Sequence, residues 1–129
     1  MSRPKRGRGS EPSYNVAPTN EVYAVRADHG HRSLAALRWG LVPFWAKDAK
    51  IGSKMINARS ETVSSKPAFR AAYKRRRCLI PADGFFEWSK VEGAKRKQPF
   101  YIYRTDGEPL VFAGLWESWR PRTTTTPRS

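Results

Sequence analysis

Short apolar runs separated by turn-forming residues constrain the fold of this chain most strongly. Three pairs of such runs occur, namely VYAVRA and LAALRWGLV around DHGH (22–42), the two halves of LIPADGFFEW around Asp83-Gly84 (79–88), and QPFYIYR and LVFAGLWESW around TDGE (98–119). Runs of this length with turn signals between them are typical of β-hairpins. We therefore expect a chain rich in strands, with each turn joining the two strands of one hairpin.

One segment favours a helix instead, KPAFRAAYKRRR at 66–77. Pro67 suits the first turn of a helix, Phe69 and Tyr73 fall four residues apart on one face, and the basic end complements the helix dipole. The expected fold class is therefore β-rich α+β, with mixed or antiparallel sheets and few helices.

The chain length of 129 residues is consistent with one domain. We expect residues 1–13 to form a flexible basic arm, 14–119 the folded domain and 120–129 a disordered tail. Eleven of the 16 aromatic residues lie between Trp39 and Tyr103, which predicts a core drawn from the middle of the chain.

Basic residues are in large excess, with 25 lysines and arginines against 11 acidic residues and a formal net charge of +14. They are clustered, with four in 3–8, six in 66–77 where no acid occurs, and four in 90–97. Such an excess favours a polyanionic partner, and nucleic acid is the first expectation. A basic surface that is merely solvated and an anionic membrane are the alternatives. No amphipathic basic helix of sufficient length supports the membrane.

The sequence contains one cysteine, Cys78, and two histidines, His29 and His31. A single cysteine excludes an intramolecular disulfide and a cysteine-based metal site, and it fits a reducing compartment such as the cytoplasm. Cys78 precedes an apolar strand, so we expect an inert buried thiol. The histidines lie in an early turn and are expected at the surface. No cofactor or metal is expected. The first residues contain no secretory signal, and no apolar run approaches membrane-spanning length.

The stretch INARSETV at 56–63 places an amide, a guanidinium and a carboxylate at alternate positions. On an extended chain Asn57, Arg59 and Glu61 would share one face. A polar row of this kind commonly faces water on a half-solvated strand, so the residues alone leave a functional role open.

Seven motifs in order resemble those of the SOS-response-associated peptidase (SRAP) family, whose members act on abasic sites in single-stranded DNA. The motifs are YNVAPTN (14–20), RWGLVPFWAKD (38–48), INARSETV (56–63), KPAFR (66–70), RRCLIPADGFFEW (76–88), QPFYIY (98–103) and FAGLWESW (112–119). The resemblance covers nearly all of 14–119. It implies a SRAP-like β-rich domain with a positively charged cleft, a role in the DNA-damage (SOS) response, a nucleoid-associated location in the cytoplasm and a monomer.

The resemblance also implies two active-site residues, Asn57 of the NAR motif and Glu87 of the EW motif. An amide can hydrogen-bond the sugar oxygens of an abasic deoxyribose without carrying charge. A carboxylate can shuttle the proton that opens the sugar ring to its aldehyde. The alternatives are an Asx-turn for Asn57 and an exposed strand carboxylate for Glu87.

Five further residues are candidates for contact with DNA. Guanidinium and ammonium groups bind phosphate, so we expect Arg59, Lys66 and Arg70 to contact the backbone of the DNA strand. The alternative for Arg59 is an ion pair with Glu61. Aromatic side chains stack on unpaired bases. We expect Trp45 and Trp88 near the DNA, and Trp39 in the core.

The sequence departs from the family pattern at two positions. The family carries a cysteine directly after the initiator methionine, whose amine and thiol close an abasic aldehyde to a thiazolidine; here Ser2 follows Met1. The family's histidine, in an HRMP-like motif after GLWE, has no counterpart.

We therefore expect a SRAP domain that appears truncated at both ends. Three explanations stay open: a truncated gene, a frameshifted gene model and a decayed paralogue. Three function classes stay open. The first is an abasic-site enzyme with crosslinking, lyase or peptidase (hydrolase) activity, the second an inactive module that binds single-stranded DNA, and the third a non-functional fragment.

Overall fold

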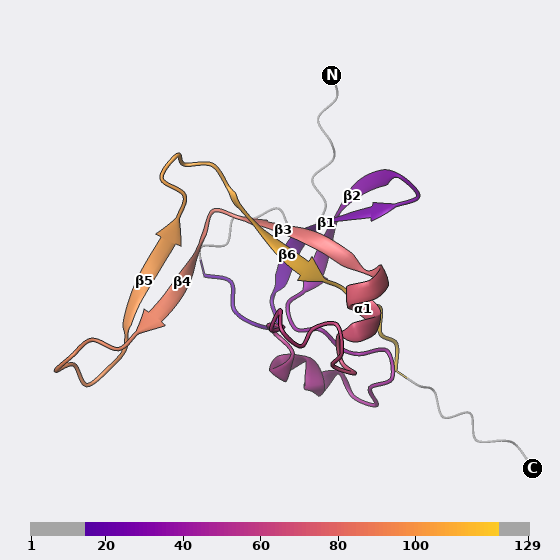
Figure 1. Ribbon diagram of the computed structural model, residues 1–129, viewed down its shortest axis with the longest axis horizontal. Coiled ribbons are helices and arrows are strands. Elements are labelled where there is room, and N and C mark those ends of the chain that lie inside the picture. Colours follow the sequence, from indigo (N-terminus) through magenta and orange to yellow (C-terminus); the bar gives the residue numbers. More distant parts are fainter. Residues whose placement is uncertain (1–14, 122–129) are drawn as a thin grey trace, which may run out of the picture.

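The structure, a computed structural model, describes residues 15–121 (Figure 1). The predicted basic arm at 1–13 and residues 122–129 of the predicted tail lie outside the described residues. The elements in order are β1 (Glu21–Asp28), β2 (His31–Arg38), the short 3₁₀ helix η1 (Ala49–Lys54), α1 (Arg70–Arg75), β3 (Arg77–Ala82), β4 (Gly84–Ser89), β5 (Gln98–Tyr103) and β6 (Leu110–Leu115). The expected β-rich α+β class with few helices is confirmed.

The strands form two antiparallel sheets, a four-stranded sheet in the order β2-β1-β3-β6 and a two-stranded sheet of β4 and β5. The first predicted hairpin is confirmed, because β1 pairs with β2 from Glu21↔Arg38 to Asp28↔His31. His29 and Gly30 at its turn have positive φ angles of 46° and 81°, as hairpin turns with the right twist require. The second strand begins earlier than predicted, at His31, and ends at Arg38.

The second and third predicted hairpins are wrong, although their strands exist. β3 pairs with β1 and β6, whereas β4 pairs with β5. Only Asp83 separates β3 from β4, and a hairpin needs a loop of about two residues. The chain therefore turns a corner at Asp83 and passes from one sheet into the other. In Figure 1, β4 and β5 project away from the larger sheet and return the chain to β6, beside β3.

The core is built mainly from small side chains. The buried residues are Ala24, Pro43, Ala46, Gly52, Phe69, Ala72 and Cys78. They come from β1, β3, α1, the turn before it, and the segment around η1. The aromatic residues of β4 and β5 do not enter this core, contrary to expectation, since Trp88 is 58% and Tyr103 63% exposed. One contact with the larger sheet is the edge-to-face pair of Phe85 on β4 and Phe112 on β6, with ring centroids 5.6 Å apart.

The predicted helix is confirmed at its centre and is shorter than expected. Residues 67–69 form a turn, and the backbone N–H of Arg70 donates to the carbonyl of Lys66 at 2.9 Å. The helix ends at Arg75, and Arg76 leaves helical geometry at φ −129° and ψ 66°. β3 begins one residue later. Within 15–121, no helix has both the length and the apolar character needed to cross a membrane.

Candidate nucleic-acid interface

Asn57 follows a tightly held loop. The indole N–H of Trp39 donates to the carbonyl of Ile56 at 2.9 Å, and the N–H of Leu41 donates to the carbonyl of Met55 at 3.0 Å. Trp39 is partly buried, consistent with its predicted place in the core. These two bonds fix the backbone immediately before Asn57, which is exposed.

Two glycines allow the loop to close. A Cβ atom at Gly40 would lie 2.5 Å from the carbonyl oxygen of Gly52, and the φ angle of Gly40 is +121°. Both features exclude a larger residue at position 40. The position of Asn57 thus depends on the close backbone contact between Gly40 and Gly52, both of which precede it in the sequence.

Residues 56–63 do not form the extended strand considered from the sequence. Residues 60–65 are in turns, and the N–H of Val63 donates to the carbonyl of Arg59 at 2.9 Å. The alternation therefore does not continue to Glu61. Asn57, Arg59 and Glu61 are exposed, and their side chains make no hydrogen bond or ion pair with other described residues. The Asx-turn and the Arg59–Glu61 pair are both absent from this part of the chain.

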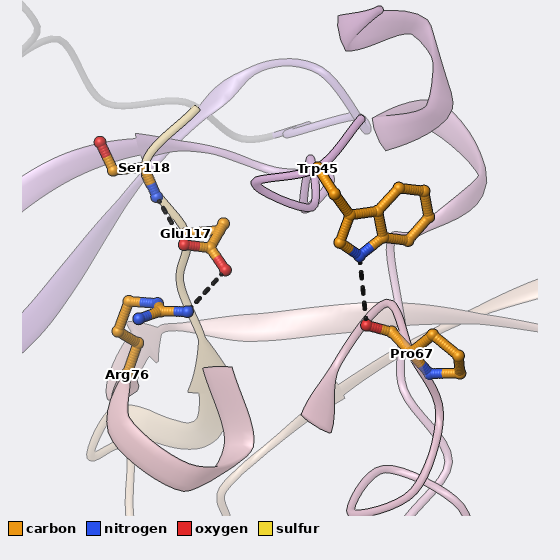
Figure 2. A network of polar contacts seen from close by, with 5 residues as sticks. All are labelled: Trp45, Pro67, Arg76, Glu117 and Ser118. Carbon is orange, nitrogen blue, oxygen red and sulfur yellow. Dashed lines mark hydrogen bonds and ion pairs between the residues drawn. The ribbon is translucent and has the colours of Figure 1, made fainter. Parts of the chain in front are cut away.

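The structure brings Trp45 to the segment that carries Lys66 and Arg70. The indole Nε1 of Trp45 faces the carbonyl oxygen of Pro67 at 3.5 Å (Figure 2). Lys66 precedes that carbonyl directly, and its own carbonyl accepts from the N–H of Arg70. Trp45 is 40% exposed, and both cations are exposed. An aromatic surface and two cations are therefore available together at one place.

The loop that carries Trp45 is also fixed from the end of the domain. The indole N–H of Trp119 donates to the carbonyl of Ala46 at 2.8 Å. Ala46 is 5% exposed. The backbone next to Trp45 is therefore held by a contact across 73 positions of sequence.

A broad basic pocket of about 690 Å³ opens beside this region. We call it the α1 pocket; its lining residues are Phe44, Ser64, Arg70, Ala71, Tyr73, Lys74, Arg75, Arg76 and Glu117. Four of the nine are basic and one is acidic. The sequence predicted a basic cluster at 66–77. Only the tertiary structure shows which residues of this cluster line one pocket with Phe44 and Ser64.

The one acid of the α1 pocket is already paired. The Arg76 guanidinium donates to a carboxylate oxygen of Glu117 at 2.8 Å, and the N–H of Ser118 donates to the other at 3.2 Å (Figure 2). The side chain of Glu117 is only 6% exposed. Its charge is therefore balanced by Arg76, and the remaining cations of the pocket stay uncompensated within the described residues.

Glu87 and Trp88 lie on β4, with side chains on opposite faces of the two-stranded sheet. Their cross-strand partners on β5 are Phe100 and Pro99. Glu87 is exposed and makes no hydrogen bond or ion pair with another described residue. No such bond joins it to Asn57 in the part of the chain that the structure describes. The two predicted active-site residues are thus accessible, on separate elements.

Cys78 is buried, as predicted. It is 6% exposed, and burial raises the pKa of its thiol, with a smaller opposing effect from the charge of Arg26. His29 and His31 are exposed, as predicted. Among residues 15–121 no group of three His, Cys, Asp or Glu side chains could hold a metal ion.

Known proteins resemble this chain in sequence and in fold. The family described as SOS response associated peptidase (SRAP) matches residues 2–128. Abasic site processing protein YoaM of Bacillus subtilis (strain 168) is 50% identical over 109 residues, which are 84% of this chain and 48% of that protein. Abasic site processing protein HMCES of Rattus norvegicus is 38% identical in an alignment of 133 positions, gaps included, that covers 84% of this chain and 38% of that protein.

Solved structures agree with the sequence matches. A crystal structure of a protein from Bordetella bronchiseptica has a TM-score of 0.73 at 33% identity, over 87% of this chain and 55% of its own. One from Bacteroides thetaiotaomicron has a TM-score of 0.67 at 28% identity, over 78% and 43%. The chain spans about half the length of the curated Bacillus relatives that it matches.

Proposed function

We propose that this chain, which belongs to the SOS response associated peptidase (SRAP) family, binds single-stranded DNA and takes part in the processing of abasic sites. The observation that carries the proposal is the 50% identity, over 84% of the chain, to a relative named an abasic site processing protein. The exposed Trp45 beside the segment that carries Lys66 and Arg70 supports it.

The strand backbone is assigned to Arg59, Lys66 and Arg70. All three are exposed, and their side chains have no carboxylate partner among residues 15–121. Cations free of acidic neighbours bind phosphate without first breaking an ion pair. Trp45, held against Pro67, and Trp88, 58% exposed on β4, are assigned to stacking on unpaired bases.

Asn57 and Glu87 are assigned to the abasic sugar. The amide of Asn57 would donate to sugar oxygens and accept from sugar hydroxyls. Glu87 would take the proton of the C1 hydroxyl and return one to the ring oxygen, which opens the ring to the aldehyde. An exposed carboxylate without a cationic partner is available for such a transfer. The two groups would have to approach the same sugar from β4 and from the loop after Ile56.

A covalent step in this chain would need an amine. A primary amine attacks the C1 aldehyde and loses water to give a Schiff base, and borohydride reduces that species to a stable amine. Lys66, which is exposed, is a candidate in the described structure. A thiazolidine needs a thiol and a free amine on the same residue, and Cys78, the one cysteine of the sequence, has its α-nitrogen in a peptide bond.

Borohydride trapping on an abasic single-stranded oligonucleotide tests this proposal. We expect a trapped band that needs reductant and is absent with an intact oligonucleotide. Glu87→Gln should weaken the band, whereas Glu92→Gln, an exposed acid in the loop after β4, should not. A band of equal strength in both variants would contradict the role of Glu87.

A second function, binding of single-stranded DNA without chemistry, is favoured by the placement of Asn57 and Glu87 on separate elements, with no hydrogen bond or ion pair joining them among residues 15–121. It predicts oligonucleotide binding and no trapped band. The absence of both binding and trapping would contradict both functions.

A further inference from the structure

The α1 pocket reaches beyond the residues assigned above and shares only Arg70 with them. Its other cations are Lys74 and Arg75, on the last turn of α1, and Arg76, directly after the helix. Lys74 and Arg75 are exposed and have no acidic partner among the described residues, whereas Arg76 is occupied by Glu117. The pocket therefore offers three cations that are free to bind an anion.

Aromatic side chains stand beside these cations. Phe44 is 59% exposed, although it lies between buried Pro43 and Trp45, whose indole contacts Pro67. Tyr73 also lines the pocket, and the guanidinium of Arg77 lies 4.4 Å from the centre of its ring. An exposed ring on a fixed backbone presents its face to a ligand at low entropic cost.

The α1 pocket is continuous with the proposed DNA contacts. Arg70 belongs to both, Phe44 is the neighbour of Trp45, and Ser64 is two residues before Lys66. Free cations interleaved with exposed aromatic side chains are the features by which proteins hold unpaired nucleic-acid strands. A membrane surface fits less well, because α1 has only six residues.

We propose that the α1 pocket holds the part of the strand that flanks the abasic nucleotide, with Lys74 and Arg75 on two backbone phosphates and Phe44 against an unpaired base. This inference rests on the proposed binding of single-stranded DNA and extends it by a second contact region. The strand would run from the Asn57 loop past Trp45 and Arg70 to the end of α1.

The test compares two charge-matched variants of the 129-residue chain. Lys74→Gln/Arg75→Gln removes two charges from the α1 pocket. Lys95→Gln/Arg96→Gln removes two exposed charges from the loop between β4 and β5, at the opposite end of the molecule (Figure 1). Affinity for a fluorescent single-stranded oligonucleotide of about 12 nucleotides is measured against salt concentration. Thermal melts of both variants establish that each is folded.

We expect the pocket variant to lower the log–log salt slope by about 1.4 and the affinity at about 0.1 M salt by roughly 25-fold, since each single-strand phosphate contact contributes about 0.7. The loop variant should change the slope by less than half as much. Phe44→Leu should weaken binding roughly fivefold or more through lost stacking, without changing the slope.

The other outcomes would overturn either the role of the α1 pocket alone or the proposed binding of single-stranded DNA as well. If the wild-type chain binds the oligonucleotide and the two double variants lose slope equally, or neither does, the α1 pocket is not a contact region and the proposed function stands. If the wild-type chain does not bind single-stranded DNA, the proposed function fails and this inference with it. Binding to vesicles that contain phosphatidylserine, lost in the pocket variant while DNA binding is kept, would assign the pocket to a membrane.

Discussion

Arg76 and Glu117 form a largely buried ion pair of 2.8 Å that joins the end of α1 to the segment after β6. The backbone reinforces the pair, because the N–H of Trp116 donates to the carbonyl of Arg76 at 3.0 Å. Residues 41 positions apart in the sequence are thereby held together at one wall of the α1 pocket.

Arg76→Leu should destabilise the chain by about 3–5 kcal/mol, because it leaves the Glu117 carboxylate buried without its partner. Urea unfolding followed by circular dichroism measures this. The double variant Arg76→Leu/Glu117→Leu should recover much of the loss. Arg104→Leu is the control, since it breaks the exposed pair with Asp106 and should leave the unfolding midpoint unchanged. Equal effects of Arg76→Leu and Arg104→Leu would contradict a stabilising role for the buried pair.

Gly114→Ala should destabilise the sheet by about 1–3 kcal/mol through overpacking. Gly114 lies opposite Cys78 in the β3–β6 pair, and a Cβ atom there would be 2.8 Å from both the Cys78 sulfur and Cδ1 of Ile80. Removing the sulfur with Cys78→Ala should recover part of the loss, so the two substitutions should not be additive. Additive unfolding free energies would show that the contact with sulfur is unimportant.

Cys78 should react slowly with thiol reagents in the native chain and rapidly after unfolding, because burial favours its neutral form. The folded pKa lies above the unfolded one, so the stabilising effect is complete below the ordinary thiol pKa and is lost as pH rises through the folded value. The stability of the wild-type chain should therefore fall relative to that of Cys78→Ala as pH rises above the ordinary thiol pKa of about 8.5. Parallel pH profiles for the two proteins would contradict this account.

Trp39→Phe should weaken DNA binding although position 39 is not assigned to the DNA. The substitution removes the hydrogen bond to the Ile56 carbonyl, which holds the backbone before Asn57, at a cost of about 1 kcal/mol in stability. Trp116→Phe, which replaces the ring beside Arg26, serves as the control. If both variants keep wild-type affinity for single-stranded DNA, the loop before Asn57 does not position a contact.

The parts of the fold that are determined by residues adjacent in the sequence could be predicted. The DHGH turn predicted the β1–β2 hairpin because His29 and Gly30 supply the local geometry that the turn needs. The pairing of β3 with β6 could not be predicted in this way, because it joins strands that are separated by the whole β4–β5 hairpin. A turn signal at Asp83-Gly84 marks a change of direction and does not say which strand will be the partner.

In the candidate site, too, features set by local sequence could be predicted, whereas contacts between distant segments could not. The composition of 66–77 predicted a basic helix and an anionic partner. The apolar strand that follows Cys78 predicted that the Cys78 thiol is buried. The sequence could not show that Phe44 and Ser64 line the same pocket as Lys74, because those contacts arise between separate segments. Nor could it show that the alternation in INARSETV ends at Arg59, where backbone hydrogen bonds begin a turn.

The proposed binding of single-stranded DNA is best tested by its salt dependence. Affinity of the 129-residue chain for a fluorescent single-stranded oligonucleotide with one abasic site is measured between about 50 and about 200 mM salt, beside the matching duplex. If the five cations assigned to phosphates each contact one, the log–log slope should be near −3.5 and the affinity should fall roughly 130-fold over this range. The single strand should bind more tightly than the duplex. Binding that is indifferent to salt, or that prefers the duplex, would contradict the account.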